Sequence, residues 1–348
     1  MIRTDLGLTY AEIGLLLAIP GVIGSGLDPL IGVLGDTGRR RAALLLGGLG
    51  FALSAALTSV SVGFWTLLVA LVIGHPASGA FVSLSQATLM DLGPERREPR
   101  MAWWTLAGSV GYVGGPVLLA AAIWIGIGWR GALFALALGA LPLAFATRRV
   151  AMPVPKDGVS VCRALRGAVG ALRRREVLRW LAVLEASDLL LDVFHGFLAL
   201  YFVDVAGSSA VEASLAVAVW TGAGLVGDAL LIPLLRRVRG VAYLRVSALV
   251  VLACYPAFLL LGCLVPKLVL LGALGLLNSG WYAIPKAGLY GALPGQSGAA
   301  IAVGGLAGIG GALIPLGVGG LAEFVGLGTA MWVLVAAPLA LLLLLPRR

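Results

Sequence analysis

Residues 177–203 read VLRWLAVLEASDLLLDVFHGFLALYFV, and apolar side chains fill most of this stretch. A bilayer core of ~30 Å is crossed by roughly 20 apolar residues in a helix, so the stretch is long enough to span it. Stretches of this kind recur along the chain, whose mean hydropathy is +1.03 and whose charged fraction is 12%. Soluble domains carry about 25% charged residues. The composition therefore predicts an integral membrane protein.

The membrane spans are predicted to be α-helices. Backbone groups in lipid must bond internally, and apolar runs such as 42–57 do not alternate with polar residues as barrel strands do. Eleven spans are predicted, five before the longest polar segment and six after it. They are residues 10–33, 42–61, 65–90, 101–125, 130–147, 177–203, 209–235, 241–263, 267–292, 298–321 and 326–345.

Basic residues favour one set of alternate loops. Twenty-one of the 25 Lys and Arg residues fall in that set, and only Arg3, Arg130 and Lys267 fall in the opposite set. Cytoplasmic loops retain basic residues, so the central loop and the C-terminus are predicted to be cytoplasmic, in a plasma-membrane protein. The net charge of +9 reflects this bias and does not require nucleic-acid binding. The predicted organisation is a helix bundle at 1–147, a cytoplasmic basic linker at 148–176 and a second bundle at 177–348.

The chain contains an internal repeat with an offset near 200 residues. The matching pairs are Glu12 and Glu212, Gly24 and Gly224, Asp28 and Asp228, Pro94 and Pro294, Gly108 and Gly308, and Gly111 and Gly311. Parallel repeats about a central loop are a transporter architecture. The helix at 177–203 precedes the second copy, but its counterpart would precede Thr9. We therefore expect the first half to lack its first helix, through a truncated gene, through a wrong start codon or in a true eleven-span protein.

A glycine-rich, charged loop joins the first two spans, with the sequence Gly32-Val-Leu-Gly-Asp36-Thr-Gly38-Arg39-Arg40-Arg41. Glycines permit tight turns and close helix approach, and Asp36 can accept hydrogen bonds at a helix N-terminus or pair with an arginine. The loop resembles the loop 2–3 signature of the major facilitator superfamily. That resemblance implies two pseudo-symmetric helix bundles and a gating role for Gly32, Asp36, Gly38 and Arg39–Arg41. The alternative is that the arginines only set the topology.

Two other spans resemble the same family in part. Residues Gly108-Ser-Val-Gly111-Tyr-Val-Gly114-Gly115-Pro116 look like the glycine–proline signature of its fifth helix, which is often linked to antiport. Gly108, Gly111 and Gly115 would allow close packing and Pro116 a bend, and ordinary tight packing is the alternative. His75 stands where the fourth helix of the family often has an arginine implicated in proton coupling, and Gln86 lies on the His75 side of that helix. Histidine can change charge near physiological pH.

Four titratable residues share one face of the span at 177–203. With ~100° per residue, Glu185, Asp188, Asp192 and His195 fall within about 80° of one another. A charge that faces lipid costs ~3 kcal/mol or more, so this face is expected to border a protein interior or a wet cavity. The resemblance likewise makes this helix seven, which lines the family's central cavity. These residues are predicted to bind protons or substrate, and a structural charge network is the alternative.

Span 267–292 is predicted to be helix ten and to add polar groups to the same cavity. Asn278, Tyr282 and Lys286 have the spacing i, i+4 and i+8, which places them on one side of a continuous helix. Lys286 and Glu185 are expected at similar depths, ~10–12 Å from the cytoplasmic boundary, by the 1.5 Å rise per residue. We therefore predict an ion pair between Glu185 and Lys286.

The function that best fits these features is a proton-coupled exporter of small, partly apolar molecules, with an uptake symporter or an inactive truncated transporter as alternatives. A magnesium-dependent intramembrane transferase is the least favoured, because the sequence lacks a second acidic cluster. No catalysis, cofactor or metal is expected, since the three cysteines form no CxxC pair and no GxxxxGK[ST] loop occurs. The expected partners are a small-molecule substrate, protons and the bilayer, without nucleic acid, and the resemblance implies a monomer.

Overall fold

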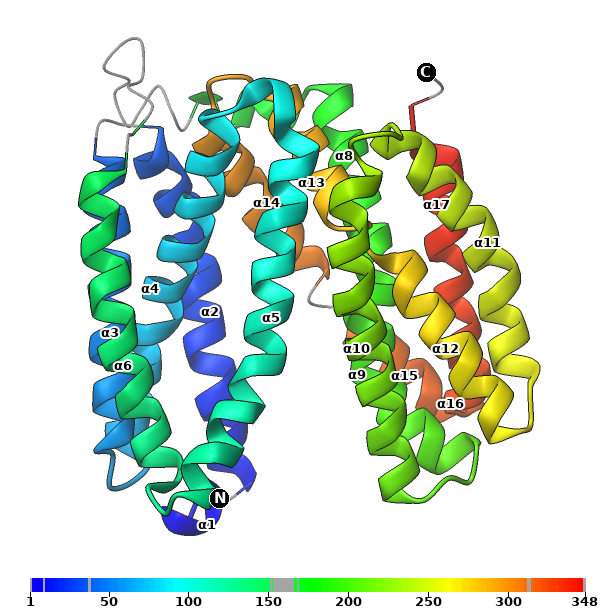
Figure 1. The fold of residues 1–348 in the computed structure, drawn as a ribbon, viewed down its shortest axis with the longest axis horizontal. Helices are drawn as coiled ribbons and strands as arrows, with labels where there is room; N and C mark the ends of the chain where they lie inside the picture. The colour runs from blue at the N-terminus through cyan, green and yellow to red at the C-terminus, as the bar shows by residue number, and fades with distance from the viewer. Residues whose placement is uncertain are drawn as a thin grey trace. The chain divides into compact units, whose positions relative to one another are not determined.

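The computed structural model describes residues 2–8, 10–36, 39–150, 152, 166–167, 169–311 and 314–346. Helices make up nearly all of these residues (Figure 1). Nine of the helices in this described part are long and apolar enough to cross a membrane, and Ile19–Gly35 and Ser297–Gly308 are shorter apolar helices. The predicted all-α membrane fold is confirmed, and a helix stands at each of the eleven predicted spans.

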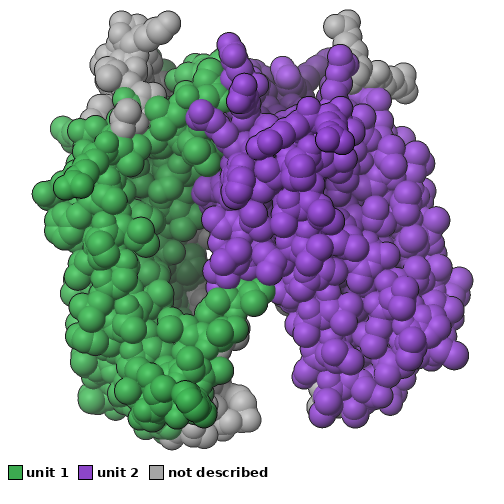
Figure 2. Space-filling model, in the orientation of Figure 1, with its two compact units in different colours: residues 1–94, 112–172, 293–306 green, residues 95–111, 173–292, 307–348 purple. Residues whose placement is uncertain are grey.

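Two compact units make up the chain, and each combines segments that are distant in the sequence (Figure 2). Unit 1 contains Met1–Pro94, Tyr112–Leu172 and Leu293–Leu306. Unit 2 contains Glu95–Gly111, Arg173–Ala292 and Ala307–Arg348. Helices α5 (Arg97–Trp124) and α14 (Ser297–Gly311) therefore each contribute residues to both units.

Unit 1 is a bundle built around α3. Helix α3 spans Arg40–Ser59. The other helices are α1 (Ile2–Asp5), α2 (Tyr10–Gly35), α4 (Phe64–Asp91), α6 (Gly128–Ala146) and the 3₁₀ turn Thr147–Arg149. Helix α3 packs against α4 and α6, and α2 packs against α4. Close approach is possible because Gly47 of α3 faces the backbone of Ala77 and Phe81, where a Cβ would lie 2.9 Å from their atoms.

Among the described residues, unit 2 has one membrane-spanning element without a counterpart in unit 1. Its helices are α8 (Arg175–Asp188), α9 (Phe194–Leu200), α10 (Ala210–Leu234), α11 (Gly240–Leu260), α12 (Leu264–Asn278), α13 (Ala283–Ala292), α15 (Ile314–Val325), α16 (Leu327–Ala330) and α17 (Ala336–Leu344). Helix α12 packs against α10 and α11, and α17 packs against α11 and α8. The additional span runs from α8 to α9, and α8 contacts α13 as well as α17.

The predicted internal repeat is confirmed by the helix boundaries. Helix α3 begins at Arg40 and α11 at Gly240, and α4 begins at Phe64 and α12 at Leu264, a difference of 200 residues in both cases. The packing partners also correspond. The pair α3 and α4 matches α11 and α12, and the pair α2 and α4 matches α10 and α12. The pair α3 and α6 matches α11 and α17. The span α8–α9 has no counterpart among the described residues of unit 1.

The two spans of unit 2 that carry predicted site residues depart from a continuous α-helix. A π turn at Leu189–Val193 lies between α8 and α9, and another at Tyr201–Val205 follows α9. The span predicted at 267–292 is broken between α12 and α13, where Gly280 has a φ of 83° that favours glycine. Irregular backbone at membrane depth requires protein partners, and the hydroxyl of Tyr243 supplies one by donating to the carbonyl oxygen of Leu277 at 3.1 Å.

An aromatic core surrounds a buried lysine in unit 2. Phe194, Tyr201, Tyr255 and Phe258 are each at most 1% exposed and stack edge to face or tilted. Lys267 is 3% exposed, and its Nζ donates to the hydroxyl of Tyr201 at 3.0 Å while lying 4.7 Å from that ring's centre. A buried ammonium is costly unless it is paired, so Tyr201 stabilises it through both the hydroxyl and the ring.

The Tyr201→Phe variant should destabilise the protein by about 1–3 kcal/mol, because the ammonium of Lys267 would lose its hydrogen bond to the hydroxyl. Thermal unfolding in detergent would measure this loss. The double variant Lys267→Met, Tyr201→Phe removes both partners and should recover most of the stability. A double variant that loses as much stability as the two single variants together would contradict this account.

Candidate functional site

The acidic stripe lies along α8, the first π turn and α9, all within unit 2. Glu185 and Asp188 belong to α8, Asp192 to the π turn and His195 to α9. Glu185, Asp188 and His195 are half-buried, and Asp192 is exposed. The i→i+5 bonds of the π turn place more residues in each turn than an α-helix has, so each residue turns through a smaller angle, and Asp192 and His195 are rotated away from the 80° face that a uniform helix predicts. The stripe therefore winds around the span.

Lys286 of α13 is the lysine whose charge acts on this stripe. Glu185 and Asp188 both lie close enough to Lys286 to feel its charge, and Asp188 also feels Glu185 and Asp192. Asp192 in turn interacts with His195. The predicted Glu185–Lys286 ion pair is not formed as a contact of 4 Å or less, so that prediction was wrong in its geometry. The result is a loose charge cluster.

Glu185 also lies against α14 at Gly311. A Cβ added at Gly311 would collide with the Oε2 atom of Glu185. This glycine is one of the repeat pairs found in the sequence, and its use is to admit the carboxylate against the helix backbone. The nearby Gly308 has no atom within 4 Å of an added Cβ.

The break between α12 and α13 changes the predicted arrangement of Asn278, Tyr282 and Lys286. Asn278 is the last residue of α12 and Tyr282 lies in the break, so the i, i+4, i+8 spacing of a continuous helix does not hold. Lys286 still contacts the ring of Tyr282 at 5.9 Å, and that ring stacks on Trp104 at 6.1 Å. The turn-forming run Asn278-Ser279-Gly280 was the sequence signal of this break.

Asn278 has an unsatisfied side chain inside unit 2. It is 3% exposed, and neither its Nδ2 nor its Oδ1 atom has a hydrogen-bond partner in the part of the chain that the structure describes. A buried amide without partners costs free energy. A broken transmembrane helix with free polar groups is typical of substrate and ion sites in transporters.

The carboxylate of Asp36 caps the N-terminus of α14 within unit 1. Its Oδ1 accepts from the backbone N–H of Gly298 at 2.6 Å and its Oδ2 from that of Ala299 at 2.9 Å. A Cβ at Gly298 would collide with the carbonyl oxygen of Gly32, so close approach needs glycine there. Burial raises the pKa of the Asp36 carboxyl, and these hydrogen bonds and the charge of Arg40 oppose the rise.

Arg40 connects Asp36 to two residues that sequence reasoning missed. Its Nη1 donates to Asp91 at 2.6 Å, its Nη2 to the hydroxyl of Ser297 at 2.5 Å, and Ser297 donates to Asp91 at 2.6 Å. The Nη2 atom lies 3.8 Å from Asp36. Asp91 ends α4 and is far from the loop in sequence, so no local spacing pointed to it.

The three arginines of the loop are not equivalent. Arg40 is buried, whereas Arg39 and Arg41 are exposed, and Arg41 donates to the carbonyl oxygen of Val150 at 3.0 Å. Gly38 lies outside the described residues. Only Arg40 can therefore serve as the buried cation of this latch, which comprises Asp36, Arg40, Asp91 and Ser297.

Residues predicted on α4 and α5 have different surroundings. His75 lies beside Gly24, where an added Cβ would collide with the imidazole, and Gln86 is 3% exposed. An added Cβ at Gly108, Gly111 or Gly115 would meet no atom within 4 Å, so the predicted close packing at these glycines is absent from the described residues. Pro116 lies within α5, which continues to Trp124.

Unit 2 contains two carboxylate contacts that the sequence analysis did not assign. Glu98 of α5 accepts from the backbone N–H of Gly240, at the start of α11, at 3.1 Å. Asp228 of α10 is 7% exposed and accepts from the hydroxyl of Ser109 at 2.6 Å. An acid inside a membrane helix is a functional candidate by default. The repeat pair Asp28 and Asp228 was the signal that could have identified Asp228.

Comparisons with known proteins agree with the fold. Residues 1–294 match the family model of the Major Facilitator Superfamily. The human Major facilitator superfamily domain-containing protein 10 is 33% identical over 176 residues, 48% of this chain and 38% of the relative. The Streptomyces lividans chloramphenicol resistance protein is 29% identical over 205 residues, 57% of this chain and 47% of the relative. The chain thus spans less than half the length of these curated relatives.

Solved structures give the same architecture. The E. coli fucose:proton symporter FucP aligns with a TM-score of 0.81 and 16% identity, over 96% of this chain and 90% of its own. The human organic anion transporter MFSD10 aligns with a TM-score of 0.65 and 22% identity, over 99% of this chain and 87% of its own. At these identities the likeness concerns the fold.

The Arg40→Ala variant should lower the free energy of unfolding by about 3–5 kcal/mol, because Asp36 and Asp91 would stay buried without their shared cation. The exposed Arg41→Ala should change it by no more than about 0.5 kcal/mol. Thermal unfolding of the two purified variants gives the comparison. Equal melting temperatures for the two variants would contradict a special role of Arg40 and would mean that the arginines serve only as topology signals.

Proposed function

Because the chain belongs to the major facilitator superfamily, we propose that it is a secondary transporter that exports a small, partly apolar molecule in exchange for protons. The two bundles at 1–147 and 177–348 alternate access to the site, and the linker at 148–176 joins them. The protein acts as a monomer in the plasma membrane. It binds the transported molecule and protons, and its helices are embedded in the lipid bilayer.

The observation that carries the proposal is the charge cluster of unit 2. The cluster contains three carboxylates, Glu185, Asp188 and Asp192. Glu185 and Asp188 both interact with the charge of Lys286, and Asp188 also interacts with the other two acids. Like charges in a poorly solvated site cannot all be ionised at low cost. One of the acids therefore takes up a proton, and a change of conformation that alters solvent access releases it. Asp188 is best placed, since it interacts with both other acids and with Lys286.

Polar groups near the cluster are suited to a neutral substrate. The unsatisfied amide of Asn278 offers a donor and an acceptor, and the stacked rings of Trp104 and Tyr282 offer an apolar face. The name of the chloramphenicol resistance relative supports export of an amphipathic compound. The latch of Asp36 and Arg40 on α14 supports gating, because it must break if α14 moves away from α2.

Proton-coupled uptake is the second candidate. It is favoured by the structural neighbours that are named as proton symporters, the fucose symporter FucP and the xylose symporter XylE. The two modes differ in the sign of the proton movement. A substrate added outside drives protons out of the lumen by antiport and into the lumen by symport.

Proteoliposomes that contain a pH-sensitive dye test both modes. Adding chloramphenicol outside should alkalinise the lumen of wild-type vesicles, whereas acidification on adding chloramphenicol or fucose would favour symport. Asp188→Asn should reduce the response to that of empty vesicles, because it removes the proton acceptor. Asp204→Asn, an exposed acid at the end of the same span, is the matched control. A wild-type response retained by Asp188→Asn would refute coupling at Asp188.

The orientation can be tested with native cysteines. Cys162 lies in the basic central loop, and Cys263 is exposed in the connection between α11 and α12, which the proposed topology puts on the opposite side of the membrane. With Cys254→Ser as background, an impermeant maleimide should label Cys263 in whole cells and Cys162 only in inverted vesicles, by the positive-inside rule. Single Cys162→Ser and Cys263→Ser variants identify each signal. The reverse pattern would place the central loop outside.

A further inference from the structure

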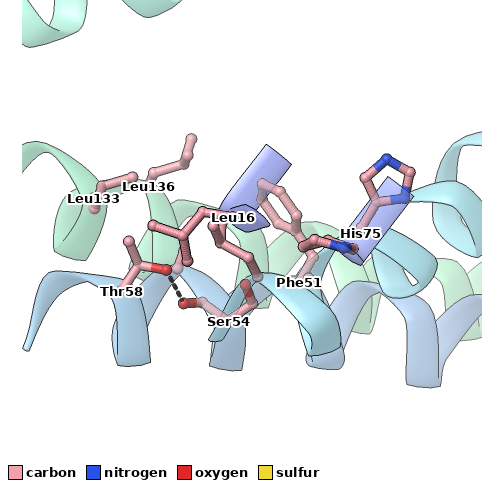
Figure 3. A pocket seen from close by; sticks show the side chains of 11 residues that line it. Leu16, Phe51, Ser54, Thr58, His75, Leu133 and Leu136 are labelled. Atoms are coloured by element: carbon pink, nitrogen blue, oxygen red, sulfur yellow. Dashed lines mark hydrogen bonds between the residues drawn. The ribbon is translucent and has the colours of Figure 1, made fainter. Parts of the chain in front are cut away.

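The two repeats keep the same helix spacing but place different side chains at equivalent positions. One difference is internal, because unit 1 contains an apolar cavity of about 310 Å³ between α2, α3, α4 and α6, with His75 at one end and Leu133 at the other (Figure 3). Three of its lining residues correspond, with the offset of 200, to the aromatic residues around Phe194 in unit 2. The pairs are Pro20 and Trp220, Ala55 and Tyr255, and Thr58 and Phe258. A second difference concerns charge.

The latch of unit 1 has a counterpart in unit 2 in which the acids are missing. The offset of 200 pairs Asp36 with Arg236, Arg40 with Gly240, Asp91 with Gly291 and Ser297 with Arg97. The latch thus contains two acids and one arginine, whereas the four residues of unit 2, which we call the basic corner, contain two arginines and no acid. The same place in the repeat is therefore negative in one unit and positive in the other.

The contacts show that equivalent positions meet in the two units. In unit 1 the hydroxyl of Ser297 donates to the carboxylate of Asp91 at 2.6 Å. In unit 2 a Cβ added at Gly291 would lie 3.8 Å from the Nη1 atom of Arg97. A carboxylate at position 291 would therefore reach the guanidinium. Glycine leaves that place, which Asp91 fills in unit 1, without a side chain.

Arg97 has no anionic partner among the described residues. Its Nε atom is buried without a hydrogen-bond acceptor in that part of the chain, and the ion pairs there do not include it. The neighbouring acid, Glu98, is already used, since it accepts from the backbone N–H of Gly240 at 3.1 Å. A buried donor without an acceptor costs free energy. Arginine presents a planar fork of donors that matches the oxygens of a phosphate or carboxylate.

The place of the basic corner favours a lipid headgroup as the anion. Arg97 begins α5 and Gly291 lies one residue before the end of α13, and both helices belong to membrane spans. The ends of spans lie at the level of the lipid phosphates, and Gly291 is exposed, so a headgroup can approach it. Basic pockets between helices on the cytoplasmic side of a membrane bind anionic headgroups, and the arginine-rich loops predict that side for this corner.

We propose that the phosphate of an anionic phospholipid binds in the basic corner, in the place that the carboxylate of Asp91 holds in unit 1. The guanidinium of Arg97 donates to the phosphate oxygens, Gly291 leaves the space for them, and Arg236 adds positive charge. The inference does not depend on the proposed transport function.

Thermal unfolding of the purified full chain in a neutral detergent at low salt tests the proposal. Phosphatidylglycerol should raise the melting temperature of the wild type more than phosphatidylcholine does. The Arg97→Ala variant should need at least about tenfold more phosphatidylglycerol for half of this rise, because a charge-assisted hydrogen bond is lost. The matched control is Arg96→Ala, which removes an exposed arginine next in sequence and should respond as the wild type does.

The Gly291→Asp variant provides a second test that does not require loss of the arginine. Its carboxylate should replace the lipid, so that the protein melts at a higher temperature than Gly291→Asn in phosphatidylcholine and gains no further stability from phosphatidylglycerol. Gly291→Asn is the control because it has the same size without the charge.

Three results would overturn the proposal. The first is an equal rise of the wild type with the two lipids, and the second is an equal phosphatidylglycerol response of Arg97→Ala and Arg96→Ala, which would indicate attraction by general positive charge. The third is a full rise with inorganic phosphate alone, which would make a free anion the ligand.

Discussion

Hydrocarbon provides neither hydrogen bonds nor counterions, and this constraint governs the polar groups of the membrane-spanning helices. The ends of transmembrane helices are the critical points, because their first backbone N–H groups have no intrahelical acceptor. Asp36 meets this need for α14 and Glu98 meets it for α11. A carboxylate at a helix N-terminus also opposes the positive end of the helix dipole. One interaction type therefore holds helices together in both units.

The candidate site lies where regular helical structure stops. The π turn between α8 and α9 and the break between α12 and α13 both occur in unit 2. Each interrupts a span that carries titratable residues, and the break between α12 and α13 also leaves the amide of Asn278 without a partner among the described residues. Irregular backbone is costly in a membrane unless it is buried in protein or lines a cavity, and broken helices of this kind are typical of binding sites in transporters. The proposed site thus coincides with local departures from an otherwise regular fold.

The sequence was sufficient for the scaffold and insufficient for details of the site. Hydropathy located the spans because length and apolarity are imposed by the bilayer, and the offset of 200 located the repeat that α3 and α11 display. The sequence could not reveal the π turn, since Leu189–Val193 has no special composition and the geometry of this turn arises from tertiary packing. It also could not separate Arg40 from Arg39 and Arg41, because burial beside Asp91 depends on a helix distant in sequence. Asp228 was visible in the repeat, but its partner Ser109 was not.

The two repeats share a scaffold but fill their interiors differently. Where unit 2 places Trp220, Tyr255 and Phe258 around a ring, unit 1 has Pro20, Ala55 and Thr58 around a cavity of about 310 Å³. Protein interiors are otherwise close-packed, with few spaces larger than a water molecule. The two halves of the duplicated chain have therefore diverged in how their interiors are filled, while the helices that surround those interiors kept the same order and spacing.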